Sequence, residues 1–126
     1  MTEQPKALIV DDSINMRKLL QLALIKVGSF KVDEAADGGE GLDKIKTTPY
    51  DVVITDVQMP VMDGFNLVRH IRESKLNRDC SIIVITVPIP DEQRQELVVL
   101  GANAVLTKPL QAHQLISTVA GLLNLT

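Results

Sequence analysis

Five polar side chains in this chain each lie at the end of an apolar run, and their chemistry suits a phosphoryl group. Asp11 and Asp12 follow "KALIV", Asp56 follows "DVVIT", Thr86 ends "SIIVIT" and Lys108 comes two residues after "AVL". Three carboxylates brought together would repel one another by about 4 kcal/mol for each close pair at an effective dielectric constant near 20. Lys108 supplies one balancing charge, and the remaining hard oxygen donors suit Mg²⁺.

A carboxylate held beside Mg²⁺ and a lysine can attack phosphorus and form an acyl phosphate. The cations and a hydroxyl group then neutralise the charge spread over the transferring oxygens. We therefore predict that Asp56 accepts the phosphoryl group, with Thr86 and Lys108 facing it. The turn signals "QMP" and "MDG" after Asp56 predict that the chain leaves the core there.

Each of these residues also has an ordinary structural explanation. Asp12 or Ser13 could cap a helix, Asp56 could be a turn residue, and Thr86 could fill a strand end. Lys108 could be a solvated surface charge. Taken singly, these explanations are at least as good as a functional role, and only the convergence of the five side chains favours chemistry.

The elements that must position these residues alternate strictly between strand and helix. Residues 6–10 form a short apolar run, and Met16, Leu20, Ala23 and Val27 then recur at helical spacing before a stop at Gly28. Four further strand-then-helix units follow: "FKVDEA" with "DGGEGLDKIK", "DVVIT" with "DGFNLVRHIRES", "SIIVIT" with "PDEQRQELVVLG", and "NAVLT" with "LQAHQLISTVAGLL". The second helix is weakened by three glycines, each costing about 1 kcal/mol in a helix interior.

This alternation predicts a doubly wound α/β fold with five parallel strands and five helices on both faces of the sheet. Parallel strands need crossover helices, and a sheet covered on both faces has almost continuously apolar strands. The carboxyl ends of all the strands then lie along one edge, where such sheets bind their ligands. The five polar side chains should therefore meet at that edge.

Composition limits the range of functions. The chain has 126 residues, 45% of them hydrophobic and 23% charged, which predicts one domain spanning residues 1–126. A net charge of −3 without a Lys/Arg run argues against direct binding of nucleic acid. The single cysteine, Cys80, gives no disulfide framework, and no signal peptide or membrane-spanning run is visible. A cytoplasmic protein is expected.

The segments "LIVDDS", "VVITDVQMPVMDG", "IIVIT" and "GANAVLTKP" resemble the response-regulator receiver domain of two-component signalling, the CheY-like fold, in order and spacing over essentially the whole chain. The resemblance implies the flavodoxin-like strand order 2-1-3-4-5. It also implies that Asp56 is the phosphoacceptor and that Asp12 and Asp56 bind Mg²⁺, with Asp11 acting largely through water. The backbone carbonyl of Gln58 would be the third protein ligand.

The resemblance further makes Thr86 the switch hydroxyl and Lys108 the phosphate-binding lysine, with a cis peptide between Lys108 and Pro109. Two positions depart from the family pattern. Val87 stands where Ala or Gly is usual, and Val105 stands where an aromatic residue usually reports the phosphorylation state. The catalytic positions are intact, whereas the signalling positions are unusual.

The resemblance also implies a partner-binding face on the fourth helix, fifth strand and fifth helix. Four consecutive apolar residues, "LVVL" at 97–100, point all the way round the fourth helix, so at least one must be exposed. A stiff β-branched Val105 has little reach, so we expect the signal to pass through Thr86 and residues 87–90 into this helix. Arg94 and Val98, one helical turn apart, are the candidate contacts.

The expected function is a receiver, not an enzyme acting on a separate substrate, that takes a phosphoryl group from a histidine kinase or phosphotransfer protein and then binds a target protein or a second copy of itself. A phosphate sink, a relay shuttle and a receiver cut from a longer regulator remain open, although Met1 suggests a native N-terminus. A dehalogenase-type phosphatase would need Asp-x-Asp, and an FMN carrier would need a phosphate-binding loop in place of "DDSIN". His70 and His113 are expected to be surface or half-buried residues and not phosphodonors, and Cys80 is expected in the packing.

Overall fold

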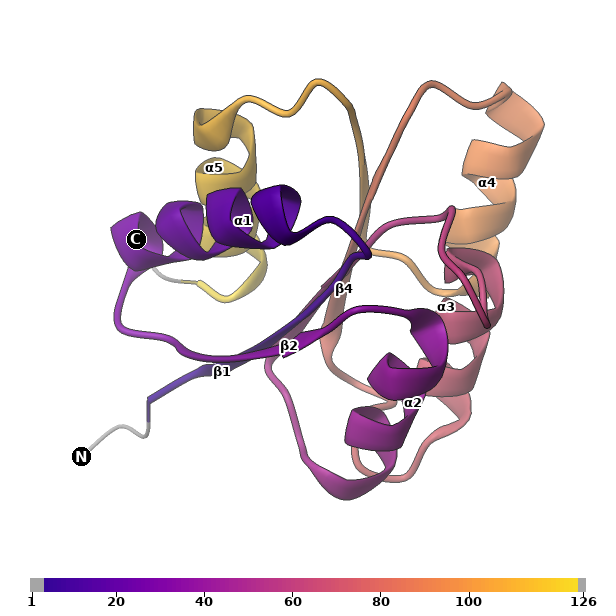
Figure 1. Cartoon of the computed structure of the whole chain (residues 1–126), viewed down its shortest axis with the longest axis horizontal. Coiled ribbons are helices and arrows are strands. Elements are labelled where there is room, and N and C mark those ends of the chain that lie inside the picture. Colours follow the sequence, from indigo (N-terminus) through magenta and orange to yellow (C-terminus); the bar gives the residue numbers. More distant parts are fainter. Residues whose placement is uncertain (1–3, 125–126) are drawn as a thin grey trace.

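The computed structural model describes residues 4–124, and within them strands and helices alternate throughout. The elements are β1 (Lys6–Val10), α1 (Ile14–Val27), β2 (Lys31–Ala35), α2 (Gly38–Thr47), β3 (Val52–Thr55), α3 (Gly64–Glu73), β4 (Ser81–Thr86), α4 (Asp91–Leu100), β5 (Ala104–Thr107) and α5 (Ala112–Leu122). Each predicted strand and helix is present (Figure 1). Gly28 ends α1, as its position in the sequence predicts.

The five strands form one parallel sheet in the order β2-β1-β3-β4-β5. This confirms both the predicted doubly wound α/β fold and the strand order that the family resemblance implies. β1 and β3 are neighbours, with Val10 paired to Thr55, so the segments that follow them emerge side by side. β4 and β5 are also neighbours, with Thr86 paired to Thr107.

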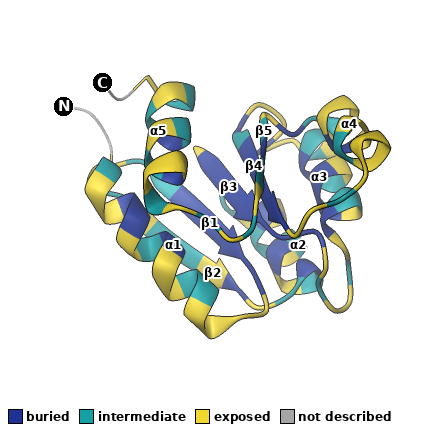
Figure 2. Cartoon of the chain, turned by 90° about the horizontal axis from the view of Figure 1, so that it is seen from above, coloured by how far each residue is buried: buried dark blue, intermediate teal, exposed yellow. Residues whose placement is uncertain are grey.

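The fold has three layers, with the sheet in the middle and helices over each of its faces (Figure 1). Helices α1 and α5 lie over one face and share a buried cluster with alternate strand residues, including Ile9, Ile54 and Leu115. Helices α2, α3 and α4 lie over the other face around Leu8, Val84 and other buried residues. Nearly all residues of the central strands β1, β3 and β4 are buried (Figure 2), which explains their continuous apolar runs, whereas β2 and β5 at the edges are partly exposed.

Helix α2 forms despite its glycines because two of them allow close packing. A Cβ on Gly38 would collide with the main chain of Met62, and a Cβ on Gly41 would lie 3.1 Å from a methyl group of Val10. Asp37 caps the helix by accepting a hydrogen bond from the Glu40 amide at 2.8 Å. The cap and the packing outweigh the intrinsic cost of glycine in a helix.

The connection between β3 and α3, which contains Met62, holds Gly64 close to the end of β3. The Gly64 amide donates to the carbonyl of Val57 at 2.8 Å, and Asp63 caps α3 through the Asn66 amide. A Cβ on Gly64 would collide with the carbonyl oxygen of Asp56 and lie 2.8 Å from Cα of Val57. The "MDG" signal therefore marks a tight return of the chain beside Asp56. No helix in the described part of the chain is long and apolar enough to cross a membrane.

Candidate functional site

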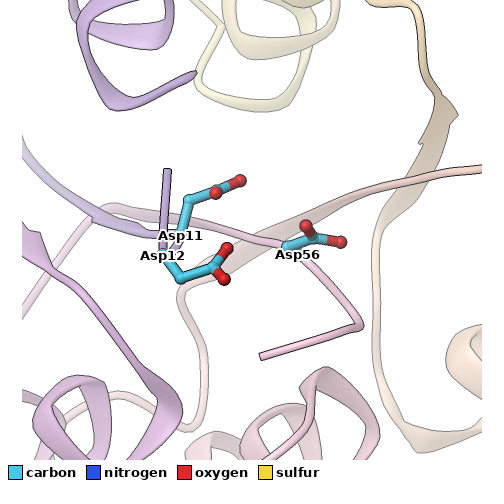
Figure 3. A group of neighbouring side chains, drawn as sticks. All are labelled: Asp11, Asp12 and Asp56. Carbon is cyan, nitrogen blue, oxygen red and sulfur yellow. The ribbon is translucent and has the colours of Figure 1, made fainter. Parts of the chain in front are cut away.

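Three carboxylates converge at the carboxyl edge of the sheet. Asp11 and Asp12 leave the end of β1 and Asp56 leaves the end of β3, and oxygens of all three lie within 4.8 Å of one another. Asp11 and Asp12 extend their side chains toward the side where Asp56 lies (Figure 3). The predicted convergence of these residues is confirmed, and it follows from the neighbouring positions of β1 and β3 in the sheet.

Asp56 is held from two directions. Its Oδ1 accepts a hydrogen bond from the Val57 amide at 2.6 Å, and its Oδ2 lies 2.7 Å from Nζ of Lys108. The residue is only 7% exposed, so the ion pair is shielded from bulk water and is stronger than a surface pair. Asp56 is thus a fixed, cation-paired carboxylate at the end of a buried strand.

Asp11 is the more deeply buried of the adjacent pair, at 2% exposure. Burial raises the pKa of its carboxyl group, while the hydrogen bond from the Ser13 amide at 2.9 Å and the charge of Lys108, 3.8 Å away, oppose this rise. Ser13, and not Asp12, caps α1 by accepting from the Met16 amide at 3.2 Å. The Asp12 carboxylate is therefore not occupied by capping.

Lys108 and Thr86 complete the edge from β5 and β4. The Lys108 amide donates to the Thr86 carbonyl at 2.7 Å, and the Lys108–Pro109 peptide is cis, as the resemblance implies. The hydroxyl oxygen of Thr86 is buried and has no hydrogen-bond partner among the described residues. A buried hydroxyl without a partner costs free energy, so this oxygen marks a position where a ligand oxygen is expected.

The donor set fits Mg²⁺. Three carboxylates supply hard oxygen ligands and a charge that a divalent cation can balance, and Asp12 is exposed enough for the water ligands that Mg²⁺ retains. Gln58 lies two residues beyond Asp56 and is exposed, and its amide is 3.4 Å from Oδ1 of Asp56. A role for its backbone carbonyl as a ligand stays a prediction.

The predicted signalling residues lie on α4, on β5 and in the connection between β4 and α4. Arg94 of α4 donates from Nη2 to the carbonyl of Val105 on β5 at 3.0 Å, which ties the helix to the strand. Val105 is buried, and Val87 is exposed at the start of the β4–α4 connection. In the apolar turn of α4, Leu97 is buried while Val98 and Val99 are 56% and 85% exposed, which confirms the prediction that the turn cannot be wholly covered.

The sequence analysis missed Arg17, whose guanidinium donates to the main-chain oxygen of Asp11 at 2.6 Å and contacts Glu34. A contact between a side chain and a main-chain carbonyl leaves no repeating pattern in the sequence. One signal was available: Arg17 is a cation near the start of a helix, where the helix dipole disfavours positive charge. Such a cation needs a specific partner nearby.

The two histidines are surface or half-buried residues of helices, as expected. His113 is exposed on α5, and His70 is half-buried on α3 with its Nδ1 2.8 Å from the carbonyl of Asn66.

Cys80 is buried, and burial raises the pKa of its thiol from 9.0 to about 11, although the charge of Arg72 partly opposes this shift. At neutral pH the thiolate fraction falls roughly 100-fold for a rise of two pKa units. We expect the native protein to react with Ellman's reagent at least about 100-fold more slowly than the urea-unfolded chain. Equal rates in the two states would show that the thiol is accessible and reactive.

Comparison with known proteins decides the family. The model of the response regulator receiver domain matches residues 7–120, which include the acidic pair, Asp56, Thr86 and Lys108. This chain belongs to the response regulator receiver domain family. It is therefore a CheY-like receiver domain of two-component signalling, as the motifs in its sequence suggest.

Similar proteins include both short and long relatives of this receiver. The chain is 33% identical over 115 residues to a probable chemotaxis protein CheY of Rhizobium etli, covering 91% of this chain and 89% of that protein. It is 40% identical over 110 residues to the sensor protein EvgS of Escherichia coli K12, covering 87% of this chain but only 9% of that protein. The structure of CheY4 of Vibrio cholerae superimposes with a TM-score of 0.87 at 35% identity, over 95% of this chain and 99% of that one.

Proposed function

We propose that this receiver accepts a phosphoryl group on Asp56 from a histidine kinase or a histidine phosphotransfer protein, in a Mg²⁺-dependent reaction in the cytoplasm. The observation that carries the proposal is the position of Asp56, where a buried, lysine-paired carboxylate meets two further carboxylates. Phosphorylation then changes the affinity of the receiver for another protein. The chain acts on its own aspartate and not on a separate substrate, so it is not an enzyme in the usual sense.

In the proposed step, an oxygen of Asp56 attacks phosphorus and forms an acyl phosphate bond. The bond between phosphorus and the donor imidazole nitrogen breaks, and the imidazole keeps that electron pair. Lys108 moves its charge from Oδ2 of Asp56 to the phosphoryl oxygens, and the free hydroxyl of Thr86 donates to one of them. Asp11, Asp12 and Asp56 would hold Mg²⁺, which supplies the positive charge that the transferring oxygens need.

The direct test is intact-mass measurement after incubation with a small acyl phosphate and Mg²⁺. We expect one phosphoryl group per chain, and none when EDTA removes the metal. A donor protein is unnecessary because the groups that stabilise the transferring phosphoryl group all belong to the receiver. Uptake that is unchanged in EDTA would contradict the Mg²⁺-dependent mechanism. A yellow preparation with a flavin spectrum would favour the FMN-carrier alternative instead.

Asp12 and Lys108 should show different defects. We expect Asp12→Asn to weaken Mg²⁺ binding by about tenfold or more, because it removes a ligand charge. Lys108→Ala should not weaken Mg²⁺ binding, since an ammonium group is not a ligand and its removal takes away a charge that repels the metal, yet it should impair phosphorylation. Calorimetric titration with Mg²⁺ and the rate of phosphate uptake separate the two effects. An equal loss of Mg²⁺ affinity in both variants would argue against these roles.

We further propose that output passes through α4. A phosphoryl oxygen gives Thr86 the partner it lacks, and the resulting shift moves residues 87–90 and the helix that follows. Arg94 connects this helix to the main chain of β5, so Val105 needs no aromatic ring for the two elements to move together. The exposed Val98 and Val99 line a shallow depression with Arg94, which suits an apolar side chain of a protein partner or of a second copy of the chain.

Beryllofluoride, a phosphoryl mimic, tests this route. We expect its addition with Mg²⁺ to shift the amide resonances of residues 87–100 as well as those of the loops that carry Asp11, Asp56 and Lys108. A response confined to those loops would show that the state of Asp56 does not reach α4. A phosphate sink or a relay shuttle would then be the better assignment.

A further inference from the structure

The acidic loop after β1 is anchored by one arginine of α1. Nη1 of Arg17 donates to the main-chain oxygen of Asp11 at 2.6 Å, while its Nε lies 2.9 Å from Oε1 of Glu34 on β2. The Arg17 side chain is 14% exposed and the Glu34 side chain 43%, so the contact with the Asp11 carbonyl is the more shielded of the two. The guanidinium group therefore joins the end of β1 to the edge strand of the sheet.

This contact fixes the peptide unit that connects Asp11 to Asp12. The peptide group is planar, so holding its oxygen also fixes its nitrogen, which belongs to Asp12. The Asp11 amide is held in turn by the carbonyl of Ala35 at 3.1 Å. By contrast, the hydrogen bonds found between residues 4 and 124 include none to the Asp12 carboxylate. The direction of that carboxylate thus depends on its main chain.

Charge alone gives Arg17 no favourable role at this edge. A cation close to a cluster of carboxylates weakens the binding of Mg²⁺, because the two cations repel each other. The pairing with Glu34 reduces this repulsion without reversing it. The benefit of Arg17 to a metal site must therefore come from geometry, and geometry and charge predict changes of opposite sign when it is removed.

We propose that Arg17 is a positioning residue for the Mg²⁺ site. It holds the Asp11 carbonyl and, through Glu34, anchors this carbonyl to β2, so that Asp12 presents its carboxylate toward Asp11 and Asp56. The inference rests on the proposed function, since it requires that these three carboxylates bind Mg²⁺. It adds a residue that touches neither the metal nor the phosphoryl group.

The test is the dissociation constant for Mg²⁺ measured by calorimetry, with no phosphodonor present. Removing a group that orients metal ligands typically costs ten- to a hundredfold in affinity, so we expect Arg17→Met to weaken binding about tenfold. Arg17→Lys keeps the charge but loses the planar fork that reaches two partners. Its affinity for Mg²⁺ should lie between that of the unaltered chain and that of Arg17→Met. Unchanged or tighter binding of Mg²⁺ by Arg17→Met would overturn the proposal.

Arg69→Met is the matched control. Arg69 pairs with Glu73 at 3.7 Å on α3 and does not contact the acidic loop, so Mg²⁺ affinity should not change. Thermal unfolding in EDTA reports whether Arg17→Met is folded, and Arg17→Lys carries the test if it is not. Saturating Mg²⁺ should restore the phosphorylation rate of the variant, whereas a general loss of folding would not be restored.

The outcomes separate this inference from the proposed function. If the unaltered chain binds Mg²⁺ and is phosphorylated on Asp56 while Arg17→Met binds Mg²⁺ equally well, only the role of Arg17 is wrong. If the unaltered chain binds no Mg²⁺, the proposed function fails and the role of Arg17 fails with it.

Discussion

Replacing Asp56 with Asn should abolish phosphate uptake from a small acyl phosphate. The amide of Asn is neutral and lacks the nucleophilic oxygen pair of the carboxylate, so no acyl phosphate can form. The amide oxygen can still accept from the Val57 amide, and Lys108 keeps Asp11 as a neighbour at 3.8 Å. We therefore expect a folded variant whose intact mass does not change on incubation with donor and Mg²⁺.

Asp43→Asn provides the matched control, because Asp43 is an exposed aspartate of α2, away from the acidic edge. This variant should take up phosphate like the unaltered chain. Undiminished uptake by Asp56→Asn would overturn the assignment of the phosphoacceptor, and peptide mapping would then locate the residue that carries the phosphate.

The second large effect concerns Gly64. A Cβ at this position would collide with the carbonyl of Asp56 and lie 2.8 Å from Cα of Val57, and main-chain atoms cannot rotate away. We expect Gly64→Ala to lower the free energy of unfolding by about 1–3 kcal/mol, the usual cost of overpacking. The displaced main chain carries Asp56, so phosphorylation should slow by at least about tenfold. Urea unfolding and timed intact-mass measurements check the two effects.

Gly121→Ala serves as the control for this substitution. A Cβ on Gly121 would meet no atom within 4 Å, and the residue lies in helix α5. Alanine is favoured over glycine in a helix, so this variant should be more stable by up to about 1 kcal/mol and should be phosphorylated normally. If Gly64→Ala matched it in both measurements, the close approach of α3 to Asp56 would not constrain the site.

The fold was predictable from the sequence because its signals are local and periodic. Apolar runs define the strands, helical spacing from Met16 to Val27 defines α1, and strict alternation requires a parallel sheet. The strand order, by contrast, came from the family resemblance, since alternation alone does not fix which strands are neighbours. The glycines of α2 weakened the helix prediction on propensity grounds, because the tertiary contacts with Met62 and Val10 that favour them cannot be seen in the sequence.

The site was predictable to the extent that it follows from strand ends. Asp11, Asp12 and Asp56 meet because β1 and β3 are adjacent, and Lys108 reaches Asp56 from β5. The contacts that hold these residues in place were not predictable. The hydrogen bonds from Arg17 to the Asp11 carbonyl and from Arg94 to the Val105 carbonyl join side chains to main-chain atoms, and any residue type could supply the acceptor.

The separation of the core into two clusters bears on how the receiver could bind a phosphodonor protein on the one hand and a target protein on the other. Side chains alternate along a strand, so Thr86 faces the same side as Val84, toward α2, α3 and α4. The cluster beneath α1 and α5 is built from the intervening residues and lies across the sheet. The sheet therefore separates Thr86 and the α4 side from the cluster beneath α1 and α5, and we expect repacking around Thr86 to be confined mainly to the first side. If phosphorylation of Asp56 changes only the α4 side, a protein that binds the face formed by α1 would bind both states equally.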